Sequence, residues 1–121
     1  MVQLILIRGL PDSGKSTMVR EYVKQGYLHF EADMYFERDG KYEFRPALLP
    51  KAHAWCLSQT KRALEEGKDV VVSNTFSRKW ELQPYLDLGY PTKILTATGN
   101  YKNIHGVPDE TIKRMKDRWE D

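Results

Sequence analysis

A chain of 121 residues with 40% hydrophobic residues, 30% charged residues and a net charge of +2 has the composition of one ordinary soluble domain. Basic and acidic residues are interleaved, so the charge neither requires nor excludes a nucleic-acid partner. No apolar run approaches the about 20 residues of a membrane span, and the strand pattern at the N-terminus leaves no room for a signal peptide. Cys56 is the single cysteine, so an internal disulfide is excluded, and we expect a buried thiol in a cytoplasmic protein.

The first 26 residues have the pattern of a strand, a glycine-containing loop and a helix. Residues 2–7 form a short apolar run rich in β-branched side chains, which is typical of a buried strand. Residues 9–17 read GLPDSGKST, in which a glycine and four free positions precede Gly-Lys-Ser. Apolar residues then recur at helical spacing from Met18 to Val23, and Gly26 supplies a stop.

This order of elements is the context in which the motif forms a phosphate-binding loop. The glycines let backbone N–H groups turn toward an anion, and the helix N-terminus adds partial positive charge. Lys15 would reach the β- and γ-phosphates, and the Ser16 hydroxyl would bind Mg²⁺. The sequence therefore predicts a nucleoside triphosphate on Gly9, Leu10, Pro11, Asp12, Ser13, Gly14, Lys15, Ser16 and Thr17.

Strand and helix patterns alternate through the rest of the chain. Further strands are predicted over residues 27–30, 69–74 and 92–98. Helices are predicted over residues 47–66 and 79–88 and from Pro108 onward, with a polar loop over 99–107. We expect one α/β domain over residues 1–121, a three-layer P-loop NTPase fold with a mostly parallel sheet of about four strands. Catalytic and ligand-binding side chains should lie at the carboxyl ends of the strands.

Three sets of side chains have expected packing roles. One side of the predicted helix over 47–66 carries Leu48, Ala52, Trp55, Gln59 and Ala63. The apolar stripe of the last helix is Ile112, Met115 and Trp119. We expect Trp80 and Trp119 to act as core or cover, and His29 and His53 to be structural or surface residues.

Residues 33–46 contain an Asp39-Gly40 turn among aromatic and charged residues, which indicates a loop or a loose hairpin. Two interpretations of its side chains stay open. They line a pocket for a phosphate acceptor, or they form the apolar underside of a surface loop; the residues concerned are Tyr35, Phe36, Tyr42, Phe44 and Arg45.

Polar residues follow the second and third strands. Asp33 would accept the proton of an attacking hydroxyl, or it caps the following turn. Asn74 and Thr75 occur where P-loop proteins usually place an aspartate for the magnesium water shell, yet Ser73 and Asn74 are neutral. Metal binding would then depend on Ser16, the phosphates and Asp33, and a neutral turn at Asn74 fits equally well.

The predicted polar loop carries a candidate for the cation that stabilises the transition state of phosphate transfer. Lys102, with help from His105, would neutralise charge on the γ-phosphate as an arginine finger does. A solvated lysine in a polar loop is the alternative.

Five segments together resemble the polynucleotide-kinase and zeta-toxin-like P-loop kinases, above all the Nedd-four-binding-protein-like ATPase/kinase domains and their phage and bacterial relatives. These segments are LIRGLPDSGKST, EADMYF, YEFRPALLPKAHAWC, VVVSNTFSRKWELQPYL and YKNIHGVPDETIKRM. The resemblance implies ATP and Mg²⁺ as ligands and a four-stranded parallel core whose central strand leads into the phosphate loop.

The resemblance also implies roles for single residues. Asp33 matches the acidic residue that activates the acceptor hydroxyl in the family. Asn74 and Thr75 match its Asn-Thr turn. Lys102 and Asn103 match the basic-Asn pair of its lid, followed by His105 and Gly106.

Two departures from the family pattern concern the acceptor and the metal. Phe36 stands where polynucleotide kinases carry an arginine that grips a substrate phosphate, so Arg38 or Arg45 would have to replace it. Ser73 stands where relatives often carry an aspartate. The hypothesis is an ATP- and Mg²⁺-dependent phosphotransferase acting on a nucleic-acid 5′-hydroxyl or a small hydroxyl compound. The rival hypothesis is a nucleotide-binding switch or adaptor with slow ATP hydrolysis, which would bind a protein partner.

Overall fold

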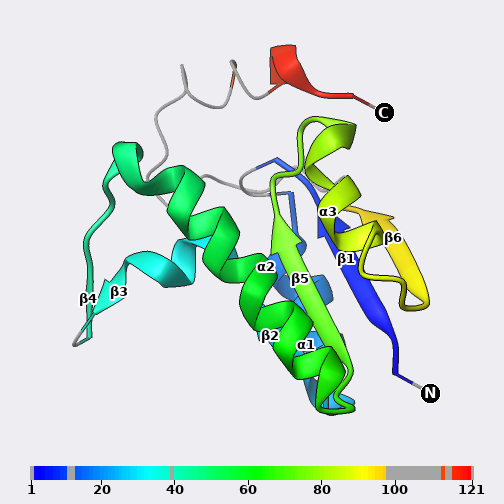
Figure 1. Cartoon of the computed structure of the whole chain (residues 1–121). Helices are drawn as coiled ribbons and strands as arrows, with labels where there is room; N and C mark the ends of the chain where they lie inside the picture. Colours follow the sequence, from blue (N-terminus) through cyan, green and yellow to red (C-terminus); the bar gives the residue numbers. More distant parts are fainter. Residues whose placement is uncertain (1, 11–12, 39, 98–112, 114–115, 121) are drawn as a thin grey trace.

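Four parallel strands form the central sheet of the computed structural model, which describes residues 2–10, 13–38, 40–97, 113 and 116–120 (Figure 1). The strands are β1 (Leu4–Arg8), β2 (Leu28–Phe30), β5 (Val70–Asn74) and β6 (Thr92–Thr96), in the order β2-β5-β1-β6. Ile7 is in register with Ser73 on one side and with Leu95 on the other. The prediction of a parallel four-stranded sheet is therefore confirmed, and the carboxyl ends of all four strands meet at one edge.

Helices cover both faces of this sheet, which makes the fold three-layered as predicted. Successive side chains of β1 point to opposite faces, and all of them are buried. Leu4 and Leu6 belong to the core that α2 (Leu49–Glu65) covers, and Ile5 and Ile7 pack with Val19 of α1 (Lys15–Lys24). Burying each such side chain contributes about 1.5–3 kcal/mol. This double burial explains the continuous apolar run at the start of the sequence.

Helix α2 packs through small side chains. A 3₁₀ turn, η2 (Pro46–Leu48), precedes it, and Pro50 lies in its first turn as expected. Its buried residues are Ala52, Cys56, Thr60, Ala63 and Leu64. Of the other residues of the predicted stripe, Leu48 and Trp55 are half-buried and pack against the same core, and Gln59 is half-buried. Cys56 is fully buried, as predicted, and burial raises the pKa of its thiol.

Of the two forms that the sequence allowed for the segment after β2, a loop or a loose hairpin, the chain adopts the hairpin, with a 3₁₀ turn in front. The turn is η1 (Ala32–Phe36), and the hairpin pairs β3 (Glu37–Arg38) with β4 (Lys41–Tyr42) in antiparallel fashion. Figure 1 shows this hairpin projecting beside the N-terminal part of α2. The 3₁₀ turn that leads into the hairpin follows the carboxyl end of β2, so the hairpin starts from the edge at which the strands end.

The predicted single helix over 79–88 was wrong. The chain forms a 3₁₀ turn, η3 (Lys79–Glu81), and then the short α3 (Gln83–Leu86), with Pro84 in the first turn of α3. Proline has no N–H to continue a preceding helix, so the pattern splits there. Trp80 is 70% exposed, and the expectation that it is core or cover was also wrong.

Of the predicted last helix, residues 113 and 116–118 are helical, and Trp119 is half-buried and covers Arg8. Ile112, Met115 and the predicted loop over 99–107 lie outside the described residues. Within the described ranges, no helix is both long and apolar enough to cross a membrane.

Candidate nucleotide and acceptor site

The glycine loop joins the carboxyl end of β1 to the start of α1. Gly14 precedes the first residue of α1 and has φ 94°, in the left-handed region that glycine adopts without a Cβ penalty. The Gly9 N–H donates to the Thr75 carbonyl at 3.2 Å. The loop is thereby tied to the chain that leaves β5, which gives the backbone of Thr75 a structural role at the site.

The space at Gly9 is filled by the loop itself. A Cβ at this position would collide with Ser13 Oγ and would lie 3.0 Å from the Ala97 Cβ and 3.1 Å from the Lys15 Cγ. Ser13 is only 6% exposed, and its hydroxyl has no hydrogen-bond partner among the described residues. A buried hydroxyl without a partner costs about 1–3 kcal/mol. A phosphate oxygen would supply the missing acceptor, so the loop fits the predicted ligand.

Lys15 lies across the loop. Its Nζ donates to the Gly9 carbonyl at 2.6 Å and to the Leu10 carbonyl at 3.0 Å. Ser16 and Thr17 occupy the first turn of α1 and are exposed, so their hydroxyls are accessible to a bound ligand. Pro11 and Asp12 lie outside the described residues.

Asp33 lies on η1, just beyond the end of β2, and is exposed. The Tyr42 hydroxyl donates to Asp33 Oδ1 at 3.3 Å, so the hairpin reaches back to this carboxylate. Burial, and after it the negative charge of Asp33, raises the pKa of Tyr42 to about 12. At neutral pH the phenol is therefore protonated, and it donates a hydrogen bond to the carboxylate.

The sequence left two interpretations open for the aromatic side chains of the segment 33–46, an acceptor pocket or the apolar underside of a loop. The structure shows some of these side chains in each arrangement. Phe36 is buried and packs edge-on against Tyr42 and Phe44, with ring centroids 6.3 and 5.1 Å away. Tyr42 and Phe44 are nearly parallel, with an interplanar angle of 8°, and are 56% and 47% exposed. Phe36 is thus the apolar underside, and the other two rings form an open surface beside Asp33.

Arg45 is exposed, and its guanidinium lies 4.0 Å from a Glu43 carboxylate oxygen. Exposed pairs of this kind contribute about 0–1 kcal/mol, so the side chain is not fixed by this contact. The role of Arg45 in gripping a substrate phosphate stays a prediction.

Asn74 holds together the ends of β5 and β2. Its Oδ1 accepts the Ala32 N–H at 2.9 Å, and its Nδ2 lies 3.9 Å from Cys56 Sγ. Ala32 begins the 3₁₀ turn that carries Asp33. Asn74 therefore holds the turn that carries Asp33 against the end of β5.

A polar group that the sequence reasoning missed lies at the same edge. Ser73 Oγ donates to Glu31 Oε2 at 3.1 Å and lies 2.8 Å from His29 Nε2. Because the hydroxyl proton goes to Glu31, Nε2 of His29 carries a proton and donates to Ser73. His29 has the structural role that we expected. Glu31 was overlooked because Asp33, two residues later, is the motif position, although both follow the same strand.

Electrostatics at Glu31 reflect its partial burial. Burial raises the pKa of this carboxyl, the Ser73 hydrogen bond and the charge of Lys15 lower it, and the charge of Asp33 raises it. Burial likewise lowers the pKa of His29. Glu31, Asp33 and Lys15 therefore act on one another within a single site.

Arg8, the last residue of β1, is a second feature that the sequence did not reveal. It is 5% exposed, and its Nε donates to the Phe76 carbonyl at 3.1 Å while Nη2 donates to the carbonyls of Ser77 and Glu120. The guanidinium carbon lies 4.2 Å from the centroid of the Trp119 ring. Phe76 has φ 46°, an uncommon conformation for a bulky residue. Arg8 thus ties the C-terminal segment to the strand that leads into the glycine loop.

Three predicted site residues, Lys102, Asn103 and His105, lie outside the described residues. In the part of the chain that the structure describes, no group of three or more His, Cys, Asp or Glu side chains could hold a metal ion.

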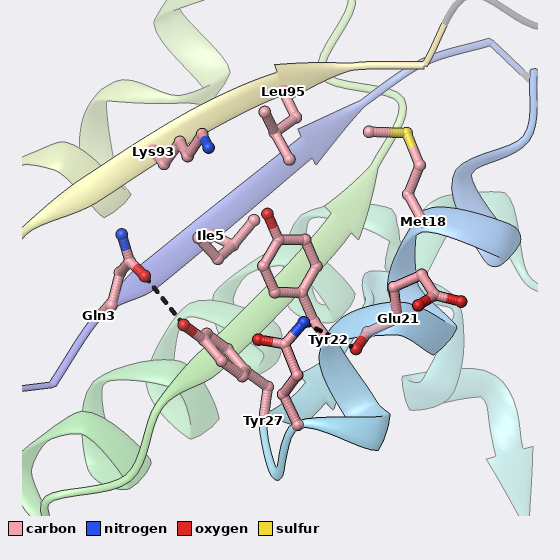
Figure 2. Close-up of a pocket in the computed structure, with 9 residues that line it drawn as sticks. Gln3, Ile5, Met18, Glu21, Tyr22, Tyr27, Lys93 and Leu95 are labelled. Atoms are coloured by element: carbon pink, nitrogen blue, oxygen red, sulfur yellow. Dashed lines mark hydrogen bonds between the residues drawn. The ribbon is translucent and has the colours of Figure 1, made fainter.

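A hollow of about 460 Å³ lies between α1 and the strands β1 and β6 (Figure 2). The hydrogen bond from the Tyr27 hydroxyl to Gln3 Oε1, 2.8 Å long, lies at one end of it. Its lining residues are Gln3, Ile5, Met18, Glu21, Tyr22, Gln25, Tyr27, Lys93 and Leu95. None of them belongs to the glycine loop or to the Asp33 segment, so this hollow is separate from the candidate site.

Two curated proteins resemble the chain over nearly its whole length. It is 33% identical over 134 residues to human NEDD4-binding protein 2, covering 97% of the chain and 8% of that protein. It is 30% identical over 118 residues to a protein of Acanthamoeba polyphaga mimivirus described as a bifunctional polynucleotide phosphatase/kinase, covering 93% of the chain and 23% of that protein. The chain thus spans a small part of each relative.

Solved structures share the fold. The chain superimposes on a chain of the Pnkp1/Rnl/Hen1 RNA repair complex with a TM-score of 0.70 and 17% identity, covering 97% of this chain and 43% of that one. A gluconokinase from Sinorhizobium meliloti gives a TM-score of 0.64 at 15% identity, with 98% and 75% covered. The APS kinase CysC of Mycobacterium tuberculosis gives 0.58 at 15% identity, with 97% and 96% covered. The fold is therefore that of P-loop kinases.

The family assignment follows from a family model that matches most of the chain. The AAA domain family AAA_33 matches residues 4–98, from the first strand to the end of the described sheet. That range contains the glycine loop, the Asp33 segment and the Asn74 turn. The resemblance to polynucleotide-kinase-like P-loop kinases is confirmed, and the chain belongs to the AAA domain family AAA_33.

Proposed function

We propose that this chain is an ATP- and Mg²⁺-dependent phosphotransferase that phosphorylates the 5′-hydroxyl end of a nucleic acid. The observation that carries the proposal is the pairing of the exposed Asp33 with the open aromatic surface of Tyr42 and Phe44. A nucleobase stacks on aromatic side chains, and each such contact contributes about 1–3 kcal/mol. A terminal nucleotide whose base stacks on these rings would bring its 5′-hydroxyl near the Asp33 carboxylate.

The donor half of the reaction belongs to the glycine loop. Lys15 and the loop N–H groups hold the phosphates, and Ser13 Oγ donates to a phosphate oxygen. Ser16 is proposed to hold Mg²⁺, which would neutralise charge on the β- and γ-phosphates. The proposed donor is ATP, and a comparison of ATP with GTP in the transfer test tells the two donors apart.

The acceptor half belongs to Asp33. Its carboxylate takes the proton from the attacking hydroxyl as the new oxygen–phosphorus bond forms and the bond to the β-phosphate oxygen breaks. Asn74 keeps the turn that carries Asp33 against β5. Lys102 is proposed to close over the γ-phosphate, with Asn103 and His105 beside it, and Arg45 is proposed to contact the acceptor phosphate.

The test is transfer of labelled γ-phosphate from ATP or GTP to single-stranded 5′-hydroxyl oligonucleotides, nucleosides and small alcohols. The Asp33→Asn variant should lose at least about 100-fold in transfer while its affinity for ATP stays unchanged. Asp87→Asn, an exposed aspartate at the end of α3, is the matched control and should transfer at the wild-type rate. Transfer by Asp33→Asn at that rate would exclude the base assignment.

Variants of the aromatic surface decide the acceptor class. Phe44→Leu should raise the KM for an oligonucleotide about tenfold without changing the KM for ATP, because leucine keeps an apolar side chain against Phe36 but has no ring on which a base can stack. If a small alcohol accepts phosphate as efficiently as an oligonucleotide, the acceptor is a small hydroxyl compound and not a nucleic acid.

A second candidate function is a nucleotide-dependent switch that binds a protein partner. The neutral Ser73 and the buried Phe36, each in place of a charged residue of the family pattern, favour it. ATP hydrolysis that no acceptor accelerates, together with a conformation that differs between ATP and ADP, would support the switch over the kinase.

A further inference from the structure

Glu31 and Ser73 lie side by side at the carboxyl ends of neighbouring parallel strands. Phe30 is in register with Val72, so the residues that follow them are adjacent across β2 and β5. The Ser73 hydroxyl donates to Glu31 Oε2 at 3.1 Å. This hydrogen bond joins the residue that follows β2 directly to the next-to-last residue of β5.

Ser73 occupies a position at which a carboxylate is expected. In P-loop enzymes, an aspartate at the end of the strand beside the loop strand helps to hold Mg²⁺. Ser73 is in register with Ile7 of β1, the strand that leads into the glycine loop. Its side chain is neutral and shorter than that of an aspartate. The hydroxyl binds a carboxylate oxygen of Glu31.

We propose that Glu31 supplies from β2 the carboxylate that β5 lacks, and that it binds the water shell of Mg²⁺ in the nucleotide complex. The assignment rests on the proposed function in that it needs an ATP–Mg²⁺ site, but it does not depend on the acceptor. Glu31 is thus a positioning residue for the metal, and Ser73 holds its carboxylate in place.

The chemistry of the available donors fits Mg²⁺. This ion prefers oxygen ligands, keeps several waters and is usually bound by one or two carboxylates together with substrate phosphates. Ser16 offers a hydroxyl in the first turn of α1, and the orphaned Ser13 hydroxyl and the filled space at Gly9 indicate where the phosphates lie. A carboxylate that acts through water tolerates a displacement from one strand to the next.

The charges around Glu31 agree with this role. Lys15, the lysine of the phosphate loop, interacts favourably with the ionised Glu31, and Asp33 interacts unfavourably with it. The two carboxylates therefore flank a region in which a divalent cation would relieve their repulsion. Since no cluster of three acidic, His or Cys residues exists among the described residues, the metal should bind only when the nucleotide is present.

The experiment measures metal binding rather than turnover. A non-hydrolysable ATP analogue is titrated into the protein by calorimetry, once in the presence of Mg²⁺ and once in the presence of EDTA. Binding of Mn²⁺ to the complex of protein and analogue is followed by electron paramagnetic resonance. In Glu31→Gln, the metal affinity of the analogue complex should fall about 10–100-fold, the loss typical of an outer-shell partner. Its affinity for the metal-free analogue should not fall.

A rescue variant separates metal binding from a structural role. Glu31→Ser combined with Ser73→Asp moves the carboxylate back to β5 and should restore the metal affinity to within a few-fold of wild type. Glu21→Gln, an exposed carboxylate in the last part of α1, is the matched control and should bind the metal normally.

Each outcome decides the proposal. A Glu31→Gln variant with wild-type metal affinity overturns it, and so does a folded double variant that stays impaired, because the defect would then be structural. Wild-type protein that does not bind the analogue at all refutes the proposed function as well. Loss in Glu31→Gln with recovery in the double variant supports the relocation of the carboxylate.

Discussion

The Tyr42 hydroxyl donates a hydrogen bond to Asp33 across the hairpin, at 3.3 Å from Oδ1. The two residues belong to different elements, since Asp33 lies on the 3₁₀ turn after β2 and Tyr42 on the returning strand of the hairpin. This contact places an aromatic surface beside the proposed catalytic base. It also couples the titration of the phenol to the charge of the carboxylate, which can be measured.

The pKa of Tyr42 should be about 12, above its ordinary value of 10, chiefly through burial and then through Asp33. Because the folded value is higher than the unfolded one, the associated stability is complete below pH 10 and is lost as pH rises through 12. In Asp33→Asn, the pKa of Tyr42 should fall part of the way back, since burial remains. Nuclear magnetic resonance of ring-labelled tyrosine measures both values, with Tyr42→Phe to assign the signal. A pKa of Tyr42 that does not respond to Asp33→Asn would contradict the contact.

Gly9→Ala should weaken ATP binding at least about tenfold, equivalent to about 1.4 kcal/mol. The added Cβ would collide with Ser13 Oγ and approach Ala97 and Lys15, so the loop must shift. Calorimetric titration with ATP measures the loss. Gly9→Ala combined with Ser13→Gly removes the closest atom and should recover part of the affinity. Equal affinity in Gly9→Ala and wild type would show that the loop tolerates the methyl group.

Asn74→Ala should lower the free energy of unfolding by about 1–3 kcal/mol, because the buried Ala32 N–H loses its acceptor. The turn that carries Asp33 would loosen at the same time, so kcat for phosphate transfer should fall more than the affinity for ATP. Urea denaturation and steady-state kinetics measure the two effects. Gln83→Ala, in an exposed pair with Asp87, is the control and should change stability by no more than about 0.5 kcal/mol. A change in ATP affinity alone would assign Asn74 to the nucleotide instead.

Arg8→Lys should destabilise the fold by about 2 kcal/mol or more, since an ammonium cannot reproduce the planar fork on the carbonyls of Phe76, Ser77 and Glu120. Trp119→Ala should cost about 0.5–2 kcal/mol through loss of the stacked guanidinium. A double-mutant cycle by urea denaturation should give a coupling energy of about 0.5 kcal/mol or more, as expected for residues in contact. Strictly additive effects would mean that the C-terminal segment does not pack on Arg8, and Arg20→Lys on the exposed face of α1 is the neutral control.

The parts of the site that could be predicted are those defined by short-range spacing. The glycine loop was recognisable because its geometry needs glycines and a lysine at fixed separations, and the flanking strand and helix have their own local periodicity. Asp33 and Asn74 were recognisable as strand-end residues. The interruption at Pro84 and the exposure of Trp80 were missed, because helical spacing and residue type do not indicate which face has a partner.

By itself, the sequence determined the strand–loop–helix unit, the parallel α/β architecture and the expectation of a nucleoside triphosphate, since all three follow from local patterns. Tertiary structure decided which strand ends are neighbours. The order β2-β5-β1-β6 brings Glu31 onto Ser73, 42 positions apart in the chain, and the packing of the C-terminal segment brings Trp119 onto Arg8. The phosphate loop can be recognised in the sequence because its residues are consecutive. The carboxylate that we propose for its metal, Glu31, follows a different strand, and only the order of the strands in the sheet places it beside Ser73.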